Sequence, residues 1–274
     1  METAASQHSF DWALLYLEIP GFLALVWFAN RGLARRGVGR SRRIYDRFDS
    51  RVQALRTWLF AAPATSVYTA IWIATTIIIV GSSPKLVDAL TIENSTNIVE
   101  IISAPLRSLA VSGFLVADQG FGLAFYLLVF VMIVARLEQR IGTPRTLVIW
   151  VAAHGGASLI TVAIEAVLIK LHDAPLKLAL TSDVGVSYVM VGSMGAYLFL
   201  VGPRWRWWYV AALALGILAP LLVVHEIDEV GHFLATAIGA VTGWSLMRVG
   251  GLRPQLLWKQ LAAASPRELA DPGT

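Results

Sequence analysis

The stretch Asp183-Val-Gly-Val-Ser-Tyr-Val-Met-Val-Gly-Ser-Met-Gly195 begins an apolar run that continues to Val201. The run approaches the length of chain that crosses the hydrocarbon layer of a bilayer. Small residues recur within it, and small side chains let two membrane helices approach closely. The stretch therefore predicts a tightly packed transmembrane helix that carries the Ser187 hydroxyl at its mouth.

A second segment, Val230-Gly-His-Phe-Leu-Ala-Thr-Ala-Ile-Gly-Ala-Val-Thr-Gly243, carries a histidine at the corresponding position. On a helix the histidine shares a face with small residues, and so does the serine of the first segment. The two faces consist of His232, Ala235, Gly239 and Gly243, and of Ser187, Val191, Met194 and Gly195. A serine becomes nucleophilic only with a base within reach. The segments therefore predict that Ser187 and His232 form a candidate catalytic pair.

The composition sets the class of protein. Hydrophobic residues make up 57% of the 274 residues and charged residues only 15%. This leaves too little polar side-chain area to coat a soluble globule of that length, so we expect an integral membrane protein. The chain contains no cysteine, which excludes disulfides, thiolate metal sites and cysteine nucleophiles.

Six apolar spans are predicted, at residues 66–82, 120–136, 146–170, 186–201, 207–224 and 229–247. Arginine-rich segments follow the second, fourth and sixth spans, at residues 136–145, 204–206 and 248–267. Positively charged loops stay in the cytoplasm, so these segments and the C-terminus are predicted to be cytoplasmic. We expect a multi-pass protein of the cell membrane, with outer segments at 83–119, 172–183 and 225–229.

The N-terminal region has a different character. Residues 12–30 are mostly apolar but contain Glu18 and Pro20, and no Lys or Arg precedes them, which argues against a cleaved signal peptide. The segment is long enough to span the bilayer, and an interfacial helix broken at Pro20 is the alternative. Nine arginines follow within residues 31–56, with apolar residues at helical spacing. This pattern predicts a basic helix on the cytoplasmic membrane surface, without nucleic acid as a partner.

The predicted topology brings the candidate pair together. The fourth and sixth spans both run from outside to inside, so Ser187 and His232 lie at similar depth. A structural interpretation is open for each residue. Serine in a membrane helix commonly donates to a carbonyl one turn back, and a histidine at a helix mouth is partly hydrated. An ionisable residue within a span nevertheless tends to mark function.

The serine and histidine segments resemble those of rhomboid intramembrane proteases. Gly185-Val186-Ser187 and Met194-Gly195 match the Gly-x-Ser-Gly motif and the later Met-Gly pair, and the histidine segment is similar to His-x-x-Gly-x-x-x-Gly. The sequence Ala135-Arg-Leu-Glu138-Gln-Arg-Ile-Gly142 is similar to the rhomboid Glu-x-x-x-Gly turn. The resemblance covers about residues 60–250, and the form Asp183-Val-Gly-Val-Ser-Tyr resembles that of a divergent rhomboid-like group in actinobacteria.

The resemblance implies an all-α polytopic protein, namely a six-helix transmembrane bundle with an additional N-terminal apolar segment. It implies that Ser187 is the nucleophile and His232 the general base, with no cofactor. The implied partners are the lipid bilayer and transmembrane substrates or clients. The corresponding regions are an N-terminal part at 1–58, the rhomboid-like domain at 59–250 and a cytoplasmic tail at 251–274.

Specific departures from the family pattern bear on activity. Tyr188 replaces the glycine after the serine, and Ala235 replaces the first glycine after the histidine. Active rhomboids carry a His-x-x-x-Asn pair in the second span that stabilises the oxyanion, and those positions are Gly122 and Tyr126 here. Backbone N–H groups before Ser187, or the Tyr126 hydroxyl, would have to substitute. Ser193 lies deeper than the motif requires and is interpreted as a packing residue.

Acidic and histidine side chains gather near the pair, at His225, Glu226, Asp228, Glu229 and His232. Asp228 or Glu229 lies one turn before His232, where it would orient the imidazole ring. A metal held by Glu229 and His232 is an alternative that the spacing alone leaves open, although the spacing is not that of a zincin. Asp183 is expected to serve this cluster or to cap the fourth span. His154 in the third span is interpreted as a packing or hydrogen-bonding residue.

Two functions of different class follow from the sequence. In the first, the protein is an intramembrane serine endopeptidase that uses Ser187 and His232. In the second, it keeps the fold without hydrolysis, as a pseudoprotease that binds transmembrane helices. The missing second-span pair favours the latter, and the retained serine and histidine favour the former.

Overall fold

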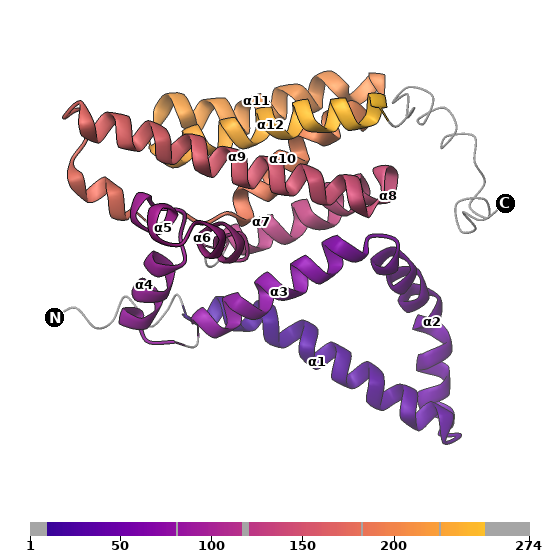
Figure 1. Cartoon of the computed structure of the whole chain (residues 1–274). Coiled ribbons are helices and arrows are strands. Elements are labelled where there is room, and N and C mark those ends of the chain that lie inside the picture. Colours follow the sequence, from indigo (N-terminus) through magenta and orange to yellow (C-terminus); the bar gives the residue numbers. More distant parts are fainter. Residues whose placement is uncertain (1–9, 81, 117–120, 182, 225, 250–274) are drawn as a thin grey trace.

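The protein is an all-helical molecule, seen here in a computed structural model (Figure 1). The structure describes residues 10–80, 82–116, 121–181, 183–224 and 226–249, and their side chains from residue 21 onward except at positions 80, 84 and 121. The first half contains α1 (Phe10–Arg35), α2 (Gly39–Phe60), α3 (Pro63–Val80), α4 (Pro84–Glu93), α5 (Ile98–Ser103) and α6 (Pro105–Ser112). The second half contains α7 (Phe121–Val129), the π-helical turn η1 (Phe130–Val134), α8 (Ala135–Ile141), α9 (Thr143–Lys170), η2 (Leu176–Leu180), α10 (Val186–Tyr197), η3 (Leu198–Leu200), α11 (Pro203–Val223) and α12 (Ile227–Val249).

Several helices have the length and composition of membrane spans. Four described segments meet both conditions on their own, namely Gly122–Ile141, Thr143–Lys170, Pro203–Val223 and Ile227–Val249. The helices α2 and α3 satisfy these conditions only as a pair, and the chain bends by 96° between them. The predicted fourth span is a shorter apolar helix over Val186–Leu200. The protein is therefore a polytopic α-helical membrane protein, as the composition predicted.

The short helix α10 forms the centre of the bundle because its glycines let neighbouring helices touch its backbone. A Cβ added to Gly239 of α12 would lie 2.1 Å from the Gly192 carbonyl oxygen, and one added to Gly195 would lie 2.2 Å from the Thr236 carbonyl oxygen. A Cβ on Gly243 would lie 2.6 Å from the Ala196 side chain. The close contact predicted from the small residues of the two segments is confirmed.

Glu138 joins three helices at one end of the bundle. Its buried carboxylate accepts hydrogen bonds from the backbone N–H groups of Ala64 (2.9 Å) and Thr65 (2.7 Å) at the start of α3. It also accepts from the hydroxyls of Thr65 (2.7 Å) and Thr143 (2.6 Å). The next turn ends at Gly142, whose φ of +83° favours glycine. The Glu-x-x-x-Gly sequence thus caps α3 with a carboxylate and turns the chain into α9.

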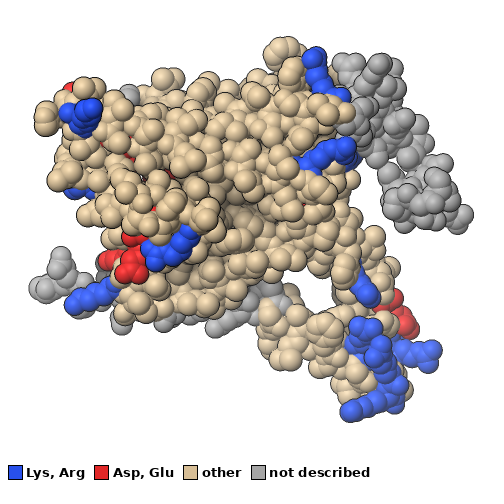
Figure 2. All heavy atoms as spheres, in the orientation of Figure 1, with Lys and Arg blue, Asp and Glu red and all other residues tan. Residues whose placement is uncertain are grey.

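Charged side chains gather at two ends of the molecule, with an uncharged surface between them (Figure 2). The arginine-bearing segments at α8 and after η3 lie at one end, because Arg136 of α8 lines a surface pocket with Gly202 and Trp205. The end of α12 reaches the same place, since Met247 packs in a cluster with Leu137. The loops predicted to share one side of the membrane therefore lie together.

The N-terminal region is a pair of helices joined by a tight turn (Figure 1). Trp27 of α1 stacks on Tyr45 of α2 at a centroid distance of 5.3 Å, and the Asn30 amide donates to the Ser41 carbonyl oxygen at 3.2 Å. The basic stretch predicted to be helical is α2, and its arginines appear as the blue side chains at the lower right of Figure 2. The apolar segment at 12–30 lies within the single helix α1, which continues through Pro20. The alternative of a helix broken at Pro20 is therefore wrong.

The predicted outer segment at 83–119 contains the short helices α4, α5 and α6. The Asn97 side chain accepts a hydrogen bond from the Glu100 backbone N–H at 2.9 Å and so caps α5. Arg107 of α6 pairs with Glu100 of α5. The helices α5 and α6 pack beside α9. Thr96, just before α5, and Ser112, at the end of α6, bond to the chain that leads into α10.

Candidate functional site

Ser187 lies in the first turn of α10, and a glycine positions it. The Gly185 backbone N–H donates to the Ser112 carbonyl oxygen at 2.9 Å, which fixes the chain as it enters the helix. A Cβ on Gly185 would lie only 2.0 Å from the His154 ring, so no larger residue fits. Ser187 itself is buried, and its hydroxyl makes a long contact of 3.4 Å with the Val184 carbonyl oxygen.

His232 lies in the second turn of α12, between an acid and an aromatic ring. Its Nδ1 atom is 3.4 Å from a carboxylate oxygen of Glu229. The Tyr188 ring and the imidazole form a T-shaped contact with a centroid distance of 5.4 Å. Of the two acids considered for orienting His232, Glu229 is the one in contact with it.

Ser187 and His232 line one pocket of about 230 Å3. Its wall includes Glu229 on α12, Gly122 and Tyr126 on α7, and Gly216 on α11. In the described structure no hydrogen bond joins the serine hydroxyl to the imidazole ring, since the hydroxyl faces the Val184 carbonyl oxygen instead. The pair that the sequence predicted thus lines one pocket, without a direct hydrogen bond between the two side chains.

Asp183 contacts a loop and does not cap the fourth span. Its carboxylate accepts a hydrogen bond from the Thr96 hydroxyl at 2.9 Å, and its carbonyl oxygen accepts from the Thr96 backbone N–H at 2.9 Å. The expected cap of the fourth span is wrong, because no side chain caps α10. Burial and the nearby negative charge of Asp228 raise the pKa of the Asp183 carboxyl to about 7. Asp183 therefore tethers the loop between α4 and α5 to the start of α10.

Asp228 lines a separate pocket of about 590 Å3, together with Glu226 and Thr181. Within the part of the chain that the structure describes, no three His, Asp or Glu side chains converge in a way that would hold a metal. His225 lies outside the described residues. Of the residues considered as metal ligands, Glu229 and His232 lie close together.

Two other polar residues are engaged in hydrogen bonds away from the pocket. The Ser193 hydroxyl accepts from the Trp150 indole N–H at 2.9 Å and donates to the Val189 carbonyl oxygen at 2.7 Å. The His154 Nε2 atom lies 2.9 Å from the Leu109 carbonyl oxygen and 3.2 Å from the Ser112 hydroxyl. Both residues hold helices together, as the sequence interpretation expected.

The sequence analysis missed the position of Tyr188. This residue is 1% exposed and fills the space between the α10 and α12 backbones, where a Cβ on Gly231 would lie 1.8 Å from its hydroxyl oxygen. The glycine at position 231, directly before His232, was the sequence feature that could have indicated a large side chain packed against this turn of α12. Tyr188, which replaces the motif glycine, thus packs against the imidazole ring of His232.

Comparisons with known proteins bear on the whole bundle. No curated protein and no solved structure is significantly similar to the chain. The sequence profile of a family described as rhomboid-like protein matches residues 57–250, well over half of the 274 residues. This range begins at the end of α2 and includes every helix that contributes to the pocket of Ser187 and His232. The chain therefore belongs to the rhomboid-like protein family.

Proposed function

We propose that the protein is an intramembrane serine endopeptidase whose nucleophile is Ser187 and whose general base is His232. The observation that carries this proposal is the pocket that both residues line, with Glu229 at the Nδ1 atom of the histidine. An acid at Nδ1 holds the proton there and leaves Nε2 as the base for the serine. Ser187, His232 and Glu229 would thus supply the nucleophile, the base and the orienting acid that acyl transfer requires.

The reaction follows from these positions. Nε2 of His232 takes the Ser187 proton while Oγ attacks the carbonyl carbon of a peptide bond in an unwound substrate segment. The tetrahedral intermediate collapses as the protonated imidazole returns the proton to the leaving amine, which leaves an acyl-serine. Water, deprotonated by the same nitrogen, then hydrolyses the ester and restores both residues.

The oxyanion requires donors that the family pattern does not supply here. The first N–H groups of a helix have no acceptor within the helix and carry its partial positive charge. Those of α10 belong to Val186, Ser187 and Tyr188, directly at the nucleophile. Such donors typically contribute ~3 kcal/mol each to the stability of the transition state. We assign the oxyanion site to this turn, with the Tyr126 hydroxyl as a second donor from the same pocket.

Substrate access follows from the walls of the pocket. One wall is α7, and the other is α11, which is almost unburied along its length. Pro220 lies within α11 beside the pocket, and a proline inside a helix removes a backbone hydrogen bond. We propose that a transmembrane substrate approaches between α7 and α11 and unwinds where it meets Ser187.

A second candidate function is helix binding without hydrolysis. Two observations favour it, namely the Ser187 contact with the Val184 carbonyl oxygen and the absence of the second-span His and Asn. In this alternative α7 and α11 bind a client helix, and the polar residues at 187, 229 and 232 only stabilise the bundle.

The two functions are separated by restoring the missing side chains. The double substitution Gly122→His and Tyr126→Asn would place the family's two side-chain donors in the pocket wall, the second in place of the Tyr126 hydroxyl. We expect fluorophosphonate labelling to rise at least tenfold over the native protein. His232→Ala added to the double variant should remove the gain, whereas Ser193→Ala should preserve it. A double variant that folds and gains no labelling, together with a native protein that no serine-directed probe labels, would favour the helix-binding alternative.

The membrane sidedness is part of the proposal. We propose that the protein lies in the cell membrane with the Arg136, Arg204 and Arg248 end in the cytoplasm, because positively charged loops stay there. The chain has no cysteine, so single cysteines are unambiguous reporters. A cysteine at Asp173 should react with an impermeant maleimide on intact cells, and one at Arg140 should react only after lysis. The reverse pattern would invert the topology.

A further inference from the structure

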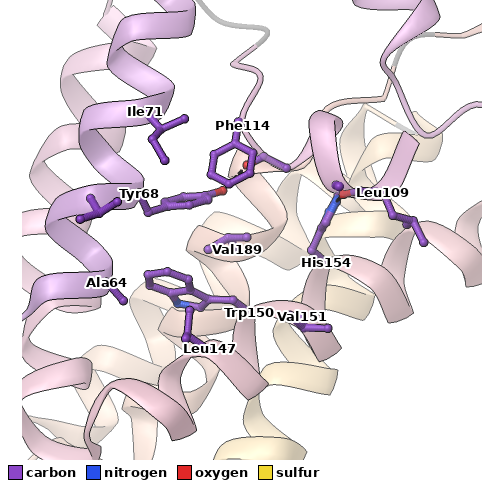
Figure 3. A pocket seen from close by; sticks show the side chains of 13 residues that line it. Ala64, Tyr68, Ile71, Leu109, Phe114, Leu147, Trp150, Val151, His154 and Val189 are labelled. Atoms are coloured by element: carbon purple, nitrogen blue, oxygen red, sulfur yellow. Dashed lines mark hydrogen bonds between the residues drawn. The ribbon is translucent and has the colours of Figure 1, made fainter. Parts of the chain in front are cut away.

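A second hollow of about 400 Å3 lies between α3, α6 and α9 (Figure 3). Aromatic rings of Tyr68, Phe114 and Trp150 surround it, and His154 closes one end. The aliphatic part of the wall comes from Ala64, Val67, Ile71, Leu109, Ala110, Leu147, Val151 and Val189. We call this hollow the α3–α9 groove.

The polar atoms around the groove already have partners within the protein. The Tyr68 hydroxyl donates to the Gly113 carbonyl oxygen, and the Trp150 indole N–H donates to Ser193. The His154 Nε2 atom faces the Leu109 carbonyl oxygen and the Ser112 hydroxyl. Since none of these side chains has a hydrogen bond to offer, the groove suits a ligand without polar groups.

The rim of the groove faces the membrane. Val67 and Ile71 on α3, and Leu147 and Val151 on α9, have exposed fractions between 41% and 73%. The helix α9 has the length and composition of a membrane span. Leu147 and Val151 lie in the half of α9 that begins near Arg145. The groove is therefore continuous with the lipid-facing surface, and its solvent is the hydrocarbon of one leaflet.

The size of the groove decides between the occupants that a membrane offers. An α-helix with its side chains is about 10 to 12 Å wide, so even a few turns of helix occupy more than the ~400 Å3 of the groove. A volume of this size is within the range of sites for small molecules. A single flexible hydrocarbon chain fits both the volume and the apolar wall.

We propose that the α3–α9 groove is a binding site for one acyl chain of a membrane phospholipid. Hydrocarbon outside the groove is as apolar as its wall, so the preference comes from close packing against the three aromatic rings rather than from the hydrophobic effect. The bound chain fills a space between α3 and α9 that their own side chains leave open. It thereby fixes α3 against the bundle, at a site that shares no lining residue with the pocket of Ser187 and His232.

The test is photo-cross-linking of the full chain in nanodiscs made with a phosphatidylcholine that carries a diazirine in one acyl chain. Mass spectrometry of the native protein should place adducts on residues 64–71 and 147–151 well above those on other exposed spans. Val151→Trp fills the groove and should lower these adducts at least fivefold. The matched control is Val241→Trp on α12, which is 64% exposed and outside the groove, and it should leave them unchanged.

A milder variant protects the test against misfolding. Ala110→Leu adds volume from α6, and it should also lower the adducts while the thermal stability in detergent stays close to native. Adducts distributed over all exposed spans in proportion to their area would contradict the proposal, as would equal labelling of Val151→Trp and Val241→Trp.

Discussion

The pocket of Ser187 and His232 and the α3–α9 groove are lined by different residues of α10, and they differ in how their polar groups are paired. Ser187 and Met190 face the pocket, whereas Val189 faces the groove. The serine makes one long hydrogen bond and the histidine one long contact with Glu229. In the groove, Tyr68, Trp150 and His154 all have close partners. Loosely paired polar groups are free to act on a substrate, and fully paired ones leave only an apolar surface.

The largest effect, a loss of folded protein, is expected when the packing of α10 is disrupted, because α10 lines both the pocket and the groove. Gly239→Ala would place a methyl group 2.1 Å from the Gly192 carbonyl oxygen, so α10 and α12 would have to separate. We expect loss of folded protein, measured as monodisperse yield in detergent. Gly155→Ala on α9 is the matched control, because nothing lies within 4 Å of its added Cβ. The control should be neutral or stabilising by up to about 1 kcal/mol. Equal yields of the two variants would refute the packing described here.

A smaller effect is expected on the groove side, through Glu138. Glu138→Ala removes the acceptor for the start of α3, including the N–H groups of Ala64 and Thr65. Buried hydrogen bonds to a charged group contribute about 1.5 to 3 kcal/mol each, and their loss should lower the melting temperature by several degrees. Gln139→Ala, whose exposed amide reaches only the Trp58 carbonyl oxygen, is the neighbouring control and should change it little. We further expect Glu138→Ala to reduce acyl-chain labelling of the groove, since α3 forms one of its walls.

The smallest effect is a dependence on pH at the pocket side, through Asp183. Its pKa of about 7 lies above the ~3.9 of an unfolded aspartate, so the folded state holds the proton over a wider range. Stability from this group is therefore complete below about pH 4 and falls as the pH rises toward 7. Asp183→Asn cannot ionise and still accepts from Thr96, so its melting temperature should decline less between pH 4.5 and 7.5. Parallel curves for the native protein and this variant would mean that Asp183 ionises normally.

The sequence predicted the catalytic side of this comparison far better than the other side. Ser187, His232 and the glycines between their helices carry spacing that is specific to a close pair of spans, and the packing of α10 on α12 confirms it. The groove has no such pattern, because Val67, Ile71, Leu147 and Val151 are the residues that any lipid-facing helix surface carries. A hollow between two helices depends on their separation, which composition does not encode.

Two further features depended on partners far away in the sequence. The turn at Glu138 was recognised from its resemblance, but its hydrogen bonds to Ala64 and Thr65 join segments that no local pattern connects. Asp183 was expected to cap α10 because it lies one turn before Ser187. It bonds to Thr96 instead, since the α4–α5 loop folds over the start of the helix. Local spacing predicts helix faces well, and it predicts the partners of loop residues poorly.

The central claim, that Ser187 is a nucleophile activated by His232, is tested most directly by finding the residue that a fluorophosphonate modifies. The native protein in detergent would be treated with the probe, digested and analysed by mass spectrometry. We predict an adduct on Ser187, formed with loss of fluoride, and its disappearance in His232→Ala while Ser193→Ala still carries it. No adduct on Ser187 in folded native protein, or one that forms equally well in His232→Ala, would contradict the claim.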